Sequence, residues 1–219
     1  MEMGNIAIDG PAGAGKSTIA KIVAKKKGYI YVDTGAMYRA MALYMIREGI
    51  EATETDKIES ACDKADISIK YENDEQVVTL NGENVNGLIR TEEVSNMASA
   101  TSVNGKVREK LVALQQKLAK ETDVVMDGRD IGTVVLPDAP CKIYLTASDD
   151  VRAKRRFDEL TAKGVECDLN EIKKDIIERD CRDMNRAISP LKRAEDAVFL
   201  DSSNLTVDEV VNKIIEIAG

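Results

Sequence analysis

Residues 10 to 17 read Gly10-Pro11-Ala12-Gly13-Ala14-Gly15-Lys16-Ser17 and match the pattern G-x-x-x-x-G-K-[ST] at every fixed position. Glycines at these positions let the backbone wrap a phosphate with its N–H groups turned inward, where Cβ atoms would obstruct it. The segment follows an apolar stretch, 5–9, that reads as a strand, and it opens a predicted helix over 16–27. The N-terminus of that helix adds partial positive charge. The segment therefore predicts a nucleoside-triphosphate site.

The last positions of this loop carry the expected chemistry. Lys16 can reach the β- and γ-phosphates as a catalytic cation, and the hydroxyl of Ser17 can ligate the Mg²⁺ that accompanies the nucleotide. A guanine-specific GTPase would need N-K-x-D, but Asn212-Lys213 continues as Ile214-Ile215. We expect the triphosphate to contact Gly10, Pro11, Ala12, Gly13, Ala14, Gly15, Lys16, Ser17 and Thr18.

Strand and helix patterns alternate along the rest of the chain. Strands are predicted at 29–32, 124–127, 141–145 and 197–200, and helices at 34–49 and from about 91, 104, 148 and 206. Thr34 is expected to cap the helix that begins there, and Thr206 forms a capping box with Glu209. Buried strands alternating with helices predict an α/β fold with a doubly wound parallel sheet, in which ligands bind at the carboxyl ends of the strands.

A segment with a different residue pattern interrupts this alternation of strands and helices. Residues 67–71 alternate between apolar and polar, residues 76–80 can pair with them across Asn73-Asp74-Glu75, and Asn81-Gly82 is a turn dipeptide. The pattern predicts a small antiparallel β insert. Residues 51–75 hold nine acidic and three basic residues, so this part of the 219-residue chain accounts for most of its net charge of −8.

Composition excludes several classes of protein. The chain has no histidine, which removes the commonest general base and transition-metal ligand. Its cysteines, Cys62, Cys141, Cys167 and Cys181, are scattered singly, as is typical of free thiols in a reducing compartment. Residues 1–5 lack the features of a signal peptide, and no apolar run approaches the ~20 residues of a membrane span. We expect a cytoplasmic monomer that binds neither membrane nor nucleic acid.

Arginines follow two of the predicted strands. Arg39 ends the segment Asp33-Thr34-Gly35-Ala36-Met37-Tyr38-Arg39, and Arg129 lies within Asp127-Gly128-Arg129-Asp130. Either arginine alone would be read as a surface residue, but two of them at strand ends beside a phosphate loop indicate a second phosphorylated substrate. Asp127 ends its strand as a Walker B acid does and could orient Mg²⁺ through water, or it could serve as a cap or ion-pair partner.

A third group of arginines lies on the predicted helix that starts near Ser148. Arg152, Arg155 and Arg156 share one side of this helix. A solvated helix face is one interpretation. We favour a mobile helical lid that closes over the triphosphate and excludes water.

Taken together, these segments resemble the bacterial cytidylate kinases, a family of P-loop nucleoside monophosphate kinases. The resemblance covers nearly the whole chain in order and rests on residues 10–17, 33–39, 89–94, 107–109, 127–135, 137–140, 179–186 and 190–191. It implies transfer of the γ-phosphoryl group of ATP to CMP or dCMP, with Mg²⁺ as cofactor. It also implies that 34–108 is an acceptor-binding region containing an insert at about 61–90, and that 148–186 is a lid with flanking arginine-rich helices, all within one domain, 1–219.

The resemblance also implies roles for individual residues. Arg39 and Arg129 would bind the acceptor phosphate, with Thr34 and Tyr38 beside them. The cytosine would be read by Ser99, Arg108 and Asp130, and the ribose by Arg179 and Asp183, with Arg186 nearer the transferring phosphates. The implied catalytic residues are Lys16, Asp127, Arg129, Arg152 and Arg186, and Arg155 and Arg156 would join the ATP site.

The missing histidine fits such a reaction. A nucleoside monophosphate attacks through an oxygen that is largely deprotonated at pH 7, because its second pKa is about 6. Two alternatives remain open. One is a small-metabolite P-loop kinase of the shikimate- or dephospho-coenzyme-A-kinase type, with Asp33 or Asp127 as base. The other is a nucleotide-dependent switch without an acceptor.

Overall fold

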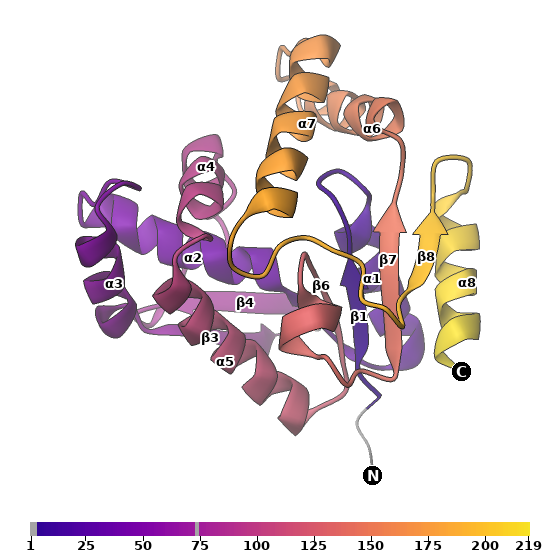
Figure 1. Ribbon diagram of the computed structural model, residues 1–219, viewed down its shortest axis with the longest axis horizontal. Coiled ribbons are helices and arrows are strands. Elements are labelled where there is room, and N and C mark those ends of the chain that lie inside the picture. Colours follow the sequence, from indigo (N-terminus) through magenta and orange to yellow (C-terminus); the bar gives the residue numbers. More distant parts are fainter. Residues whose placement is uncertain (1–3, 73–74) are drawn as a thin grey trace.

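The computed structural model describes residues 4–72 and 75–219. Within these ranges a five-stranded sheet has the order β2-β6-β1-β7-β8, and every neighbouring pair is parallel (Figure 1). Its strands are β1 (Ile6–Asp9), β2 (Ile30–Asp33), β6 (Val124–Gly128), β7 (Cys141–Thr146) and β8 (Val198–Asp201). The predicted strands at 29–32 and 197–200 are each confirmed with a shift of one residue.

Helices cover both faces of this sheet, as the doubly wound prediction requires. The helices α1 (Lys16–Lys27) and α8 (Val207–Ala218) pack on one face, where Ile8, Ile143 and Val211 are buried together. The helix α5 (Gly105–Glu121) and the π-helical turn η1 (Ile131–Val135) pack on the other face. The capping box of α8 at Thr206 and Glu209 is confirmed.

The predicted insert forms a separate antiparallel sheet, in the order β3-β4-β5. Its strands are β3 (Ile67–Glu72), β4 (Glu75–Leu80) and β5 (Glu83–Asn84). Asn81 and Gly82 both have positive φ, which matches the expected turn. The proposed turn at Asn73 and Asp74 lies outside the described residues, as does the start of the N-terminal stretch, 1–3. A second hydrophobic core joins this sheet to α2 (Thr34–Arg47), α3 (Thr55–Lys64) and α4 (Glu92–Thr101).

One predicted cap is wrong. Asp33, not Thr34, caps α2, because Asp33 keeps an extended backbone at the end of β2 and its carboxylate accepts a hydrogen bond from the backbone N–H of Ala36 at 2.9 Å. Thr34 is already helical, and its hydroxyl donates instead to the carbonyl of Asp127 at 2.7 Å. This bond ties α2 to the end of β6.

The remaining helices, α6 (Asp149–Ala162) and α7 (Leu169–Asn185), pack against each other. Ser148 caps α6, at the point where the sequence predicts that this helix begins. In Figure 1 the two helices stand at the top of the view, beyond the arrowheads of the parallel strands, which is the end where the predicted site lies. Among the described residues, no helix combines the length and apolar character needed to cross a bilayer.

Candidate active site

A cleft of about 730 Å³ lies at the carboxyl ends of the parallel strands, between the phosphate loop, α2, α4, α6 and α7. It brings together most of the residues that the sequence singled out. The predicted residues that line it are Ala12, Gly13, Ala14, Gly15, Lys16, Ser17, Thr18, Thr34, Tyr38, Arg39, Ser99, Arg108, Asp127, Arg129, Asp130, Arg155, Arg156, Arg179, Asp183 and Arg186. Gly10, Pro11 and Arg152 do not line it.

The phosphate loop is fixed by close contacts beneath it. At Gly10, with φ of 149°, a Cβ atom would lie 1.9 Å from the carbonyl oxygen of Leu145, so only glycine fits between β1 and β7. Lys16 is buried, and its ammonium donates to the carbonyl of Pro11 at 2.7 Å. Burial, and after it the positive charge of Arg129, lower the pKa of Lys16 well below its ordinary value. A bound polyanion would offset the cost of burying this charge.

Both oxygens of the Asp127 carboxylate are held by hydroxyl groups. Ser17 Oγ donates to Asp127 Oδ2 at 2.9 Å, and Tyr31 OH donates to Oδ1 at 2.8 Å. Burial, and after it the negative charge of Asp33, raise the pKa of Asp127. Burial and the adjacent Asp127 also raise the pKa of Tyr31, so the tyrosine remains a hydrogen-bond donor. A carboxylate and a hydroxyl thus lie together at the start of α1.

Asp33, the neighbour of Asp127 in the register of β2 and β6, holds two arginines. Its Oδ2 lies 3.0 Å from Arg39 Nη2 and 3.1 Å from Arg90 Nη2. The Arg39 side chain is mostly buried, whereas that of Arg90, which follows the insert, is 64% exposed. One carboxylate therefore aligns two guanidinium groups along the wall of the cleft.

A further group of arginines comprises Arg129, directly after β6, Arg179 on α7 and Arg186, directly after α7. Arg129 Nε donates to Asp183 Oδ2 at 2.8 Å, and Arg186 lies 3.9 Å from the other oxygen of Asp183. Burial works to raise the pKa of Asp183, but Arg129 and the neighbouring arginines outweigh it and hold this pKa below its ordinary value. Burial, followed by the charge of Arg129, lowers the pKa of Arg179 to about 10.

Arg108 and Asp130 form a buried ion pair at the floor of the cleft. Arg108 also donates to the carbonyl of Ser102 at 3.1 Å and lies over the ring of Tyr38, with 5.6 Å between its Cζ atom and the ring centroid. Burial raises the pKa of Tyr38 to about 12. Ser99 lies on α4 and lines the same cleft.

Several arginines here retain buried nitrogens without a hydrogen-bond partner. They are the Nε atoms of Arg39, Arg108 and Arg179 and the Nη2 atom of Arg186. All four arginines line the cleft together with Arg129, so several positive charges surround one space, which favours an anionic ligand with several oxygen acceptors. This part of the cleft is therefore a candidate site for a phosphate group.

The lid arginines do not share one environment, contrary to expectation. Arg155 donates to the carbonyl of Ser202 at 2.8 Å, and Arg156 pairs with Glu159 at 3.0 Å, and both line the cleft. Arg152 is buried instead. It donates to the carbonyl of Ala12 at 2.7 Å and pairs with Asp180 at 2.6 Å.

Asp180, the ion-pair partner of Arg152, also contacts the phosphate loop, because its Oδ1 accepts a hydrogen bond from the backbone N–H of Ala12 at 3.1 Å. Both backbone polar groups of Ala12 are thus bonded to side chains of α6 and α7. Arg152 differs from the other two arginines because it faces the seam between α6 and α7, where it supports the phosphate loop from behind.

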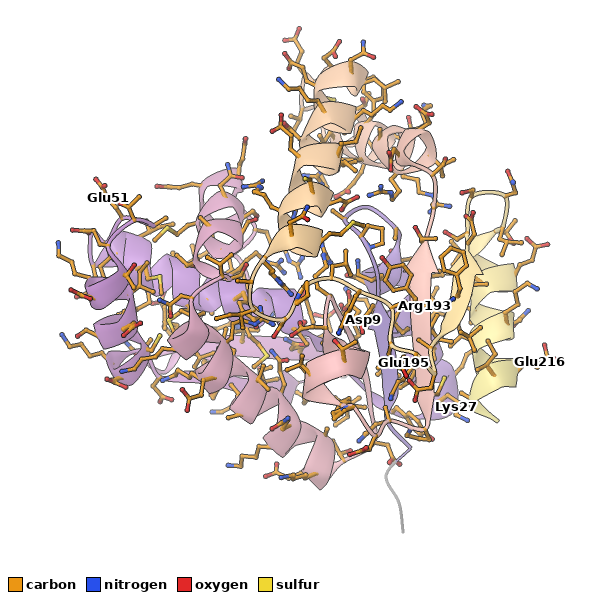
Figure 2. The ribbon with its side chains drawn as sticks, viewed as in Figure 1. Asp9, Lys27, Glu51, Arg193, Glu195 and Glu216 are labelled. Carbon is orange, nitrogen blue, oxygen red and sulfur yellow. The ribbon has the colours of Figure 1, made fainter. Side chains whose placement is uncertain are left out.

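Four residues that shape this site had no role predicted from the sequence. They are Asp9, Tyr31, Arg90 and Asp180. Asp9, whose side chain is drawn inside the molecule in Figure 2, accepts hydrogen bonds from the backbone N–H groups of Ile131 at 2.8 Å and Gly132 at 2.7 Å. Its only signal was an acid at the end of an apolar strand, whereas Arg90 and Asp180 lie inside the segments that carried the family resemblance.

Comparison of the sequence with known proteins shows the family to which the chain belongs. The family model described as cytidylate kinase matches residues 6–219. The chain belongs to the cytidylate kinase family. The resemblance noted from its sequence is therefore confirmed.

Relatives named cytidylate kinase match over nearly their whole length. One from Caldicellulosiruptor saccharolyticus is 54% identical over 97% of this chain and 94% of its own, and one from Lactobacillus gasseri is 52% identical over 97% and 92%. A crystal structure of an uncharacterized protein from Eubacterium ventriosum covers 97% of this chain and 96% of its own with a TM-score of 0.53 and 14% identity, which supports the fold alone.

Proposed function

We propose that this cytidylate kinase family member transfers the γ-phosphoryl group of ATP to CMP or dCMP and releases ADP with CDP or dCDP. The observation that carries the proposal is the set of arginines that line the same cleft as the phosphate loop, namely Arg39, Arg90, Arg108, Arg129, Arg179 and Arg186. A second anionic substrate facing the triphosphate explains why they converge there. Family membership identifies that substrate as a cytidine nucleotide.

In this proposal the donor half of the cleft binds ATP. The loop from Gly10 to Thr18 surrounds the phosphates, and Arg155 and Arg156 approach from α6. Lys16 neutralises charge that develops on the transferring group. Arg152 acts through the loop, because its contact with the Ala12 carbonyl fixes the backbone that carries the phosphate-binding N–H groups.

The residues at the start of α1 fit Mg²⁺. The Ser17 hydroxyl and the Asp127 carboxylate, 2.9 Å apart, are hard oxygen donors of the kind that Mg²⁺ prefers, and Mg²⁺ commonly takes few protein ligands beside nucleotide phosphates. Ser17 would ligate the ion directly and Asp127 would orient its shell. The ion would supply charge neutralisation on the β- and γ-phosphates.

The acceptor half binds the monophosphate. Arg39 and Arg129 grip its phosphate, with Thr34 and Tyr38 at the edge of that site. Ser99, Arg108 and Asp130 read the cytosine, since a carboxylate accepts from an exocyclic amine. Arg179 and Asp183 contact the ribose, and Arg186 bridges Asp130 and Asp183 at 3.7 and 3.9 Å, at the junction of the two substrates.

No proton needs to be removed from this acceptor, since its phosphate oxygen is already anionic. Catalysis then consists of alignment and charge neutralisation, to which Lys16, Arg129, Arg186 and Mg²⁺ would contribute. A small-metabolite kinase would need a free carboxylate as base. Asp33 is engaged by two arginines and Asp127 by two hydroxyls, and the family match does not favour that alternative.

The proposal also covers the organisation of the chain into regions and the location of the protein in the cell. The region 34–108, with its separate core, would be the acceptor-binding part, and 148–186 the lid. We propose a monomer in the cytoplasm, and the cytoplasmic location agrees with the free thiols of all four cysteines, which suit a reducing compartment.

A coupled assay of ADP release tests the function with CMP, dCMP, UMP, AMP and shikimate as acceptors. We expect the highest kcat/KM with CMP or dCMP and formation of the corresponding diphosphate. Faster turnover with shikimate would favour the small-metabolite kinase. Tight ATP binding with negligible turnover on every acceptor would favour a nucleotide-dependent switch.

A further inference from the structure

The insert sheet contacts the main sheet at the free edge of β2. In β2, Tyr31 and Asp33 are two positions apart, so their backbone polar groups point to the same edge. The opposite edge of β2 pairs with β6. Tyr71 OH donates to the carbonyl of Tyr31 at 3.1 Å, and Gln76 meets the backbone of Asp33. Side chains of the insert therefore take the place of a neighbouring strand.

The contact between Gln76 and Asp33 is two-sided. The side-chain oxygen of Gln76 accepts from the backbone N–H of Asp33 at 2.7 Å, and its amide nitrogen donates to the carbonyl of Asp33 at 3.3 Å. Gln76 is held in turn by Asn86, which donates to the Gln76 carbonyl at 2.7 Å and accepts from the N–H of Val78 at 2.9 Å. The Gln76 amide thus links the insert to one residue of β2, and the Asn86 amide holds the backbone that carries Gln76.

That residue organises the acceptor arginines. The Asp33 carboxylate caps α2 through the N–H of Ala36 and pairs with both Arg39 and Arg90. The position of this carboxylate depends on the backbone that carries it, and Gln76 bonds both polar groups of that backbone. Gln76 itself does not line the cleft.

We propose that Gln76 is a positioning residue for the acceptor site, which acts by holding the backbone of Asp33 so that the Asp33 carboxylate presents Arg39 to the acceptor phosphate. This role rests on the proposed function of the cleft. It also gives the insert a function, because the sheet delivers the Gln76 amide to the end of β2.

The test compares Gln76→Met, which keeps a side chain of similar length without its amide, with Ser68→Ala. Ser68 Oγ lies 2.6 Å from Thr79 Oγ1 inside the insert sheet, so its loss weakens the insert without touching β2. We expect Gln76→Met to raise the KM for CMP about tenfold, with the KM for ATP changed less than about twofold. Ser68→Ala should leave both KM values near wild type. Equal effects of the two variants on the KM for CMP would overturn the proposal.

A second measurement does not depend on the acceptor. Hydrogen exchange of the Ala36 amide reports on the Asp33 carboxylate, because that amide donates to it. We expect faster exchange at Ala36 in Gln76→Met, and in Gln76→Glu should Gln76→Met fail to fold, but not in Ser68→Ala. Unchanged exchange at Ala36 would overturn the positioning role. If wild-type protein formed no CDP, the proposed function would fail, and the exchange result would still decide the role of Gln76.

Discussion

Asp33 and Asp127 face each other across β2 and β6, as partners in the parallel register of the two strands. Neighbouring strands lie only about 4.8 Å apart, yet the two carboxylates bind different sets of side chains. Asp33 holds Arg39 and Arg90, and Asp127 accepts from Ser17 and Tyr31. In the proposed function the acceptor and donor sites therefore meet at one pair of strand ends, which suits direct transfer between two bound phosphates.

Their proximity has an electrostatic consequence. The negative charge of Asp33 contributes, after burial, to the raised pKa of Asp127. Arginines on one side and hydroxyl donors on the other stabilise the two charges separately. A cation bound beside Asp127 would favour its ionised form, so binding of a metal–nucleotide complex and ionisation of Asp127 are expected to be coupled.

The first prediction concerns Arg129, which lies between the phosphate loop and Asp183. Arg129→Ala removes a charge that the proposed transition state requires, so kcat/KM for CMP should fall about 1,000-fold while the affinity for ATP changes little. Steady-state kinetics and equilibrium binding of ATP measure the two effects. Arg47→Ala, which removes an exposed arginine paired with Glu83, is the matched control and should be near wild type. Near-normal kinetics of Arg129→Ala would contradict the assignment.

Asp130 should determine the choice of base. Asp130→Asn preserves size and leaves an oxygen for Arg108, but it replaces an acceptor with a donor. The exocyclic amine of cytosine would lose its partner and the carbonyl of uracil would gain one. We expect the ratio of kcat/KM for CMP over UMP to fall about 10- to 100-fold. Kinetics with both acceptors provide the measurement, and a ratio equal to that of wild type would exclude base reading by Asp130.

Local sequence patterns predicted the phosphate loop with its flanking strand and helix, and the arginines at the strand ends. The strand, loop and helix from Ile6 to Lys27 follow directly from glycine spacing and apolar periodicity. The arginines at strand ends were found because a parallel sheet places all carboxyl ends together. The cap of α2 was misplaced by one residue because aspartate and threonine are both good caps. In the structure Asp33 is the cap, and it also contacts Gln76 and Arg90, two residues far away in the sequence.

Long-range contacts explain what the sequence did not predict. Helical spacing placed Arg152 on the same side of α6 as Arg155. It could not show that α7 packs against α6 and that Arg152 is buried. The π-helical turn after β6 lies where the carboxylate of Asp9, 122 positions away in sequence from Ile131, accepts two of its backbone N–H groups. No pattern within residues 128–135 encodes that partner.

Arg152 should contribute to stability far more than its neighbours on α6. Arg152→Met leaves Asp180 buried without its guanidinium, so the free energy of unfolding should fall by about 3 kcal/mol or more. The exposed pair of Arg156 and Glu159 is worth less than about 1 kcal/mol by the same measure. Urea denaturation of Arg152→Met and Arg156→Ala provides the comparison. Equal, small losses for both variants would show that Arg152 does not brace the phosphate loop.

Asp9 should make stability depend on pH in mildly acid solution. Burial raises its pKa to about 6, although the N–H groups of Gly132 and Ile131 oppose the shift, and the nearby charges are Asp130 and Lys16. Its unfolded pKa is near 3.9, so between about pH 4 and 6 the native state binds more protons than the unfolded state. Stability from this group is therefore present below pH 4 and is lost as the pH rises through 6.

Asp9→Asn isolates that contribution, since the amide does not titrate. The free energy of unfolding of wild type relative to Asp9→Asn should fall by up to about 3 kcal/mol between pH 4 and pH 7, and change little above pH 7. Urea denaturation of both proteins across this range measures the difference. Glu216→Gln, which alters an exposed acid at the outer face of α8 in Figure 2, should show no such trend. A difference between wild type and Asp9→Asn that stays constant with pH would mean that Asp9 is ionised throughout, held in that state by the two N–H groups it accepts from η1.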